Sequence, residues 1–146
     1  MPLAKLQKHL FTVVQKEPHV TVRLYPEMKF LYVEWQGVIS SEELRSVFIK
    51  NCALVIEHGV EVAVADFSRL SIPLLADQLW IANHAKEQLK CSKLTRIANI
   101  MAPELLQQLS IDTLNGSSSD GLPPCVTRDF MLEEDALSWL FPEGFC

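Results

Sequence analysis

A hydroxyl, an imidazole and a carboxylate make up a hydrolytic triad, and the chain has two candidates of each kind between residues 58 and 84. They are Ser68 and Ser71, His58 and His84, and Asp66 and Asp77. A triad is defined by its geometry, however, and any chain of this size contains such residues. The sequence also lacks the G-x-S-x-G pattern of a nucleophile elbow. These residues therefore predict a protein that is not an enzyme.

Other kinds of chemistry also lack a motif in this sequence. There is no P-loop and no G-x-G-x-x-G, and with 5 glycines in the whole chain a phosphate-cradling loop is not expected. The 4 cysteines form no C-x-x-C pair and have no histidine at metal-ligand spacing. They are Cys52, Cys91, Cys125 and Cys146. We expect free thiols, no metal and no cofactor.

Charge and hydropathy narrow the range of partners. The chain has 13 basic and 18 acidic residues, a net charge of −5, and no basic cluster, so no nucleic-acid partner is expected. No uninterrupted apolar run reaches the roughly 18 residues of a membrane span, so no membrane insertion is expected. Lys5, Lys8 and His9 interrupt the N-terminal apolar residues, which argues against a secretory signal. The predicted location is the cytoplasm.

The segment from Val60 to Ser71 is the predicted centre of the fold. Its first residues are apolar on both faces, as in a central strand covered by helices, and Asp66 ends that pattern. A short polar turn is expected next, with Ser71 capping a new helix and Pro73 in its first turn. Asp66 either accepts hydrogen bonds from the N–H groups of this turn or lends negative charge to a recognition surface.

The elements that position this segment follow from hydrophobic periodicity. Length and pattern predict one α/β domain over residues 19–146, preceded by an arm or short helix over residues 1–18. The expected sheet is mixed and mostly parallel, with about 4–5 strands and about 4 helices in the order ββαβαβαβα. The strands are predicted at 19–25, 30–36, 60–67, 94–101 and 125–131, and the helices at 40–58, 71–90, 102–114 and 133–141. The first of these helices is expected to begin with a capping box of Ser40 and Glu43 and to end at His58 and Gly59.

Two surfaces stand out in this arrangement. The outer face of the first hairpin is expected to be polar and aromatic, and it comprises Arg23, Tyr25, Tyr32 and Glu34. The helix after Ser71 has more apolar residues than one sheet contact needs, namely Leu74, Trp80 and Ile81. These three side chains either form a contact with a partner or a second copy, or cover the sheet edge and the N-terminal arm.

Several short motifs, taken in order, resemble a known family. They are Phe30–Gly37 (FLYVEWQG), Ser41–Leu44 (SEEL), Val64–Ser71 (VADFSRLS) and Glu134–Leu140 (EDALSWL). Over residues 19–141 the chain resembles the STAS domain, with the SpoIIAA-like fold of anti-sigma-factor antagonists. It is more closely similar to small bacterial STAS/SEC14-like proteins of uncharacterised function. The resemblance rests on the order and spacing of the motifs.

The resemblance implies a signalling or protein-interaction role without catalysis. In STAS antagonists a kinase phosphorylates a hydroxyl at the start of the helix after this strand, and the added charge ejects the partner. Here that position falls near Leu75, so the usual phosphoacceptor is not expected. The protein partner is not identified by the sequence, and a homodimer is a second form of the same contact. The expected partner-binding residues are Asp66, Ser68, Arg69, Ser71, Leu74, Trp80 and Ile81.

The alternative function is a small-molecule or lipid-binding module of the SEC14-like kind. It requires an apolar cavity between helix and sheet, which we would expect near Trp35, Phe48 and Trp80.

Overall fold

Six strands form a single mixed sheet, in which every strand pairs with its neighbours in sequence. The structure, a computed structural model, describes residues 10–104 and 125–143. The strands are β1 (Thr12–Glu17), β2 (Val20–Tyr25), β3 (Phe30–Gly37), β4 (Val62–Leu70), β5 (Arg96–Ile100) and β6 (Val126–Phe130). The pairs β1–β2 and β2–β3 are antiparallel, and the three later pairs are parallel. The prediction of a mixed, mostly parallel sheet is confirmed, with six strands instead of four or five.

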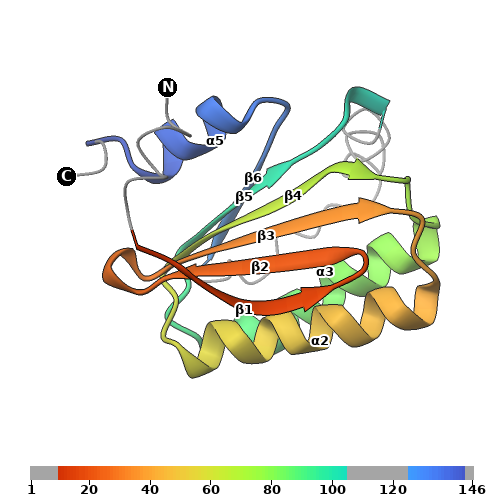
Figure 1. Ribbon diagram of the computed structural model, residues 1–146, viewed down its shortest axis with the longest axis horizontal. Helices are drawn as coiled ribbons and strands as arrows, with labels where there is room; N and C mark the ends of the chain where they lie inside the picture. Colours follow the sequence, from red (N-terminus) through yellow and green to blue (C-terminus); the bar gives the residue numbers. More distant parts are fainter. Residues whose placement is uncertain (1–9, 105–124, 144–146) are drawn as a thin grey trace.

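The helices lie on both faces of this sheet (Figure 1). Helix α2 (Ser41–Glu57) and helix α3 (Leu75–Leu89) lie side by side on one face, whereas α5 (Glu133–Leu140) covers part of the other. Each face has its own hydrophobic core, one that includes Trp35 and Leu44 and one that includes Phe30 and Leu137. A single 3-10 turn, Pro26–Met28, joins β2 to β3.

The start of the chain provides a strand that the sequence did not single out. Residues 1–18 were expected to form an arm or a short helix, and within this range Thr12–Glu17 form β1, antiparallel to β2. Its β-branched residues Thr12, Val13 and Val14 favour this extended conformation. Residues 1–9 lie outside the described part of the chain.

Helix α2 begins and ends as its sequence predicts. The Ser40 hydroxyl accepts a hydrogen bond from the Glu43 N–H at 3.2 Å, which satisfies one of the free donors of the first turn. At the other end Gly59 has a φ of 59°, the left-handed conformation that glycine adopts without strain. The capping prediction is confirmed at both ends.

The last elements also agree with the sequence where they are described. Strand β6 and helix α5 fall inside the predicted ranges 125–131 and 133–141. Of the helix predicted over 102–114, the structure describes the beginning, where Pro103 and Glu104 are helical, and the rest lies outside the described residues. The helices of at least one full turn within the described ranges are therefore α2, α3 and α5, compared with the four predicted.

Candidate functional site

The segment that the sequence placed at the end of a strand lies within β4. Strand β4 continues to Leu70, so the predicted polar turn after Asp66 is wrong. The chain forms a β-bulge instead. Glu34 and Gln36 of β3 pair with Asp66 and Arg69 of β4, so β4 has one more residue than β3 between the two pairs. The reason is tertiary: Phe67 stacks on Trp35 with the ring centroids 6.0 Å apart, and Leu70 is buried.

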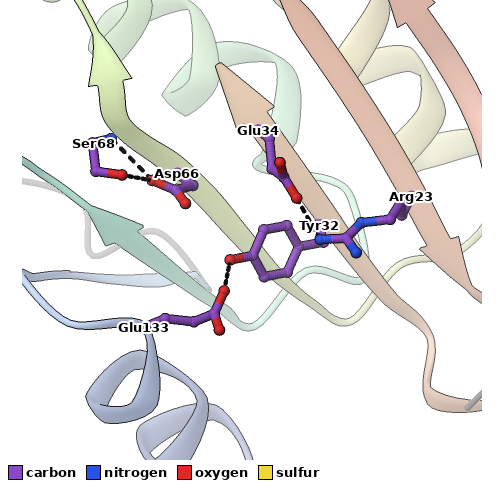
Figure 2. A network of polar contacts seen from close by, with 6 residues as sticks. All are labelled: Arg23, Tyr32, Glu34, Asp66, Ser68 and Glu133. Carbon is purple, nitrogen blue, oxygen red and sulfur yellow. Dashed lines mark hydrogen bonds and ion pairs between the residues drawn. The ribbon is translucent and has the colours of Figure 1, made fainter. Parts of the chain in front are cut away.

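Asp66 fixes the conformation of this bulge. Its Oδ1 accepts hydrogen bonds from the Ser68 backbone N–H at 2.9 Å and from the Ser68 hydroxyl at 2.6 Å (Figure 2). This is the structural role that the sequence offered for Asp66, in which an aspartate binds the backbone two residues ahead. The Ser68 hydroxyl is therefore engaged as a donor within the bulge.

Beside the bulge, polar contacts on the α5 face join two strands, β2 and β3, to α5 (Figure 2). Arg23 of β2 pairs with Glu34 at 2.5 Å, and its guanidinium lies over the ring of Tyr32, 4.6 Å from the centroid. The Tyr32 hydroxyl donates a hydrogen bond to Glu133 in the first turn of α5. Burial raises the pKa of Tyr32, and the bond to Glu133 and nearby carboxylates raise it further. Tyr32 is therefore a neutral hydrogen-bond donor.

This network corrects the expected outer surface of the first hairpin. Tyr25 and Tyr32 were expected on an exposed face, but each is 1% exposed. Both belong to the core that α5 covers, and Tyr25 also stacks on Phe30 with the centroids 5.3 Å apart. The hairpin that this alternating pattern predicts is confirmed, since β2 and β3 pair antiparallel. The pattern carried no signal that a helix about 100 residues later would cover this face.

The start of α3 differs from the prediction as well. Ser71 does not cap the helix, because α3 begins at Leu75 and its N-cap residue is Leu74, which makes no side-chain capping bond. The Ser71 N–H instead donates to the Gly37 carbonyl at 2.9 Å, extending the contact between β3 and β4. The predicted helix start at Ser71 is therefore wrong by about one turn.

The segments around this start carry several exposed apolar side chains. They come from the β3–α2 connection, the β4–α3 connection and the first turns of α3, which meet at the end of the sheet where β3 and β4 finish (Figure 1). We call them the apolar end surface: Val38, Ile72, Leu74, Leu75 and Leu79, between 45% and 77% exposed. Leu74 was expected here, and the other four were not singled out.

Trp80 and Ile81, the other two apolar residues expected at a partner surface, contact the protein itself. Trp80 stacks on His84 at 4.6 Å between ring centroids, meets Phe48 edge-on, and has the Arg45 guanidinium 5.1 Å from its ring centre. Ile81 packs against the core beneath α3. The two aromatic residues expected to line a lipid cavity with Trp80 are likewise in contact, Phe48 with Trp80 and Trp35 with Phe67.

The triad residues do not come together as a triad. Asp66 binds Ser68, whereas Asp77 binds Ser41 and Arg45, and His84 stacks on Trp80. No serine hydroxyl in residues 10–104 and 125–143 is shown hydrogen-bonded to an imidazole. Burial also raises the pKa of Cys52 to about 12 and that of Cys125 to about 11, so neither thiol is an activated nucleophile.

The described residues contain neither a metal-binding cluster nor a membrane-spanning helix. Their histidine, cysteine and carboxylate side chains include no group of three that could hold a metal ion. None of the helices in the described ranges combines the length and the hydrophobicity of a membrane span.

Sequence reasoning missed the buried contact of Asp77, which is 4% exposed. Its signal was present, because Asp77, Trp80, Ile81 and His84 follow the i, i+3, i+4, i+7 spacing of one helix face. Leu75 and Leu79, four residues apart on another face of the helix, are exposed.

The comparisons with known proteins concern the fold. No protein-family model matches the chain, and no curated protein matches it. The structure is similar to an uncharacterised protein of the DUF3478 family with a SpoIIAA-like fold from Shewanella loihica PV-4, with a TM-score of 0.50 and 17% identity over 90% of this chain and 92% of that one. It is also similar to the anti-sigma factor antagonist SpoIIAA in its unphosphorylated form, with a TM-score of 0.52 and 13% identity over 91% and 97% of the two chains. The chain has a SpoIIAA-like fold, as its sequence motifs predicted.

Proposed function

We propose that this chain is a non-enzymatic STAS-like regulatory domain that binds a protein partner at the end of β4 and the start of α3. The observation that carries the proposal is the apolar end surface, five large exposed apolar side chains on segments that meet at one end of the sheet. Apolar side chains grouped in this way mark interaction sites more often than isolated ones do. The expectation of a cytoplasmic bacterial signalling protein belongs to the same proposal.

The bulge in β4 completes this surface. Ser68 and Arg69 are exposed, and Asp66 holds Ser68 in place, so the polar groups beside the apolar side chains have a fixed geometry. A rigid polar rim around an apolar centre is the usual anatomy of a protein–protein interface. Ser71 and Leu74 continue the surface to α3, whereas Ile81 packs against the core and Trp80 against Phe48 and His84.

The proposed partner is bound without the usual phosphoacceptor. SpoIIAA, which has the same fold, is an anti-sigma factor antagonist with an unphosphorylated form. In this chain Leu74 and Leu75 begin the corresponding helix, and neither has a hydroxyl. The nearest serines have structural contacts, Ser68 with Asp66 and Ser71 with Gly37. The proposal therefore includes control of partner binding by a means other than phosphorylation at the start of this helix.

The test is affinity capture from the native cell with matched variants. The wild-type chain, the double variant Leu74→Asp/Leu75→Asp and the control Ile56→Asp are used as bait. Ile56 lies on α2 and is 52% exposed, so it matches the chemistry of the change without touching the surface. We expect a protein that binds wild type and control, is lost with the double variant, and binds the purified chain at a fixed stoichiometry. Capture that is identical for all three baits would contradict the proposal.

A second copy of the chain is the alternative partner proposed for this surface. Light scattering coupled to size exclusion gives the mass of the wild type and of Leu74→Asp directly. A dimer that Leu74→Asp converts to a monomer assigns the surface to self-association. A strict monomer in both samples removes the homodimer and leaves the heterologous partner.

A further inference from the structure

The first turn and the remainder of α3 are attached to the protein in different ways. From Ile81 onward, Ile81, Ala85 and Leu89 pack on the core beneath the helix. Before Ile81, Leu75 and Leu79 are exposed, and the one buried side chain is the carboxylate of Asp77, 4% exposed. The first turns of α3 are therefore attached mainly through a polar group.

Asp77 is held by two residues from the first turns of α2. The Ser41 hydroxyl donates to Oδ2 at 2.5 Å, and the Arg45 Nε and Nη2 both lie 3.1 Å from Oδ1. We call Ser41, Arg45 and Asp77 the Asp77 clamp. The Arg45 guanidinium also lies over the ring of Trp80. It therefore forms both an ion pair with Asp77 and a cation–π contact with Trp80.

A clamp of this kind differs from apolar packing in its physical behaviour. Hydrogen bonds and ion pairs depend on distance and direction, so a small displacement of the helix breaks them together. A charge that loses its partner while buried is unstable, and the element that carries it moves out to water. Leu75 and Leu79 oppose such movement less than core leucines would, since 45% and 53% of their surface is already exposed.

We propose that the Asp77 clamp, and not apolar packing, holds the first turns of α3 against the sheet and sets how often this segment opens. The sheet and α2 stay folded when it opens, as in other local unfolding reactions. Its consequence for binding rests on the proposed function: Leu74, Leu75 and Leu79 belong to this segment, so opening removes them from their docked position. The apparent affinity for a partner of the docked form then falls in proportion to the docked fraction.

The test is amide hydrogen exchange on the full chain, read by mass spectrometry. The variants are Asp77→Asn, which removes the charge, and Arg45→Lys, which keeps the charge but loses the two-nitrogen contact. The control is Glu17→Gln, which removes the pair between Glu17 of β1 and Lys50 of α2, at 3.6 Å. We expect exchange in residues 74–84 to be at least tenfold faster in both clamp variants and unchanged in the control. Exchange in β4 and in residues 44–55 of α2 should stay at the wild-type rate.

Two results would overturn the inference. One is equal acceleration of exchange in α3, α2 and the sheet, which would make the clamp a contribution to global stability. The other is no change in residues 74–84. If Asp77→Asn does not fold, Ser41→Ala replaces it, with Ser46→Ala on the exposed side of α2 as its control. No partner is needed for this measurement, so a failure of the capture experiment and a failure of the clamp are separate outcomes.

Discussion

Helices α2 and α3 lie side by side on one face of the sheet, but the protein holds them by different means. Helix α2 buries Leu44, Val47 and Val55, and Ser40 caps it. Helix α3 has no side-chain cap, and its buried residues are Asp77 and Leu89. Both helices follow a strand and both contain many apolar residues. The first is part of the core, and the second presents apolar side chains to solvent at its start.

The difference comes from the phase of the apolar residues, not from their number. In α2 the buried apolar residues share the inward face, so their burial stabilises the helix and the sheet together, and Ile49 and Ile56 are its two exposed large apolar residues. In α3, Leu75 and Leu79 lie on another face from Trp80 and Ile81. A helix with apolar residues on two faces can attach to its own sheet and still offer a second contact. This property connects the fold to the proposed function.

The largest effect that we predict from this comparison is in cysteine reactivity. Cys52 is buried on α2, and burial raises its pKa to about 12, whereas Cys91 follows α3 and is exposed. At pH 8 a thiol with a pKa of about 12 is thiolate in roughly one molecule in ten thousand. With iodoacetamide at pH 8, we expect Cys91 to be alkylated at least about a thousandfold faster than Cys52.

Peptide-level mass spectrometry measures this difference, because it separates Cys91 from Cys146, which lies outside the described residues. Cys125 serves as an internal control, since burial raises its pKa to about 11. Equal rates at Cys52 and Cys91 would mean that α2 opens as readily as the chain after α3, and the comparison would fail.

The next effect is on stability. Leu44 of α2 is 1% exposed, so Leu44→Ala should lower the free energy of unfolding by about 2–5 kcal/mol, the range for buried leucines. Leu75 is 45% exposed at the start of α3, and Leu75→Ala should change it by no more than about 0.5 kcal/mol. Urea denaturation followed by fluorescence measures both. A loss above about 2 kcal/mol for Leu75→Ala would place that side chain in the core.

Most of the fold could be predicted from the sequence, since local signals determine it. The first hairpin follows from an alternating pattern of neighbouring residues, and the cap of α2 joins Ser40 to Glu43, three residues later. Both predictions are confirmed. The candidate site was predicted less completely, because its geometry depends on contacts between distant residues. Trp35 stacks on Phe67 and extends β4, and Tyr32 binds Glu133 across 101 residues of sequence. Nothing near these residues in the sequence specifies such pairs.

Helix α5, on the opposite face, is held at its first turn by a polar contact, as α3 is. This contact is the hydrogen bond from Tyr32 to Glu133, and the variant Tyr32→Phe tests it. Tyr32→Phe removes the hydrogen bond to Glu133 and should lower the free energy of unfolding by about 1.5–3 kcal/mol at pH 7, the range for bonds to charged groups. Because the pKa of Tyr32 is raised in the folded protein, its ionisation favours the unfolded chain. The stability that it contributes is complete below about pH 10 and is lost as the pH rises above that value.

The advantage of the wild type over Tyr32→Phe should therefore shrink by about 1.4 kcal/mol between pH 9 and pH 11. Urea denaturation at a series of pH values measures it, with the difference between the two proteins taken at each pH. The difference removes the contribution of other groups that titrate in both, including Tyr25. A constant difference from pH 7 to pH 11 would show that Tyr32 ionises equally well in the folded protein.

The smallest effect concerns the two serines that the sequence offered as helix caps. Ser40 caps α2 through the Glu43 N–H, so Ser40→Ala should lower the free energy of unfolding by about 1 kcal/mol. Ser71 precedes α3 without capping it, and its backbone N–H contact with Gly37 survives the change to alanine, so Ser71→Ala should have an effect below about 0.5 kcal/mol. Urea denaturation of the two variants, compared with the wild type, shows whether Ser71 caps a helix as its sequence context predicts or makes no capping bond, as in the structure. Equal losses would mean that Ser71 caps α3 in solution, and the start of that helix, with its exposed leucines, would then be fixed by its own first turn as firmly as the start of α2.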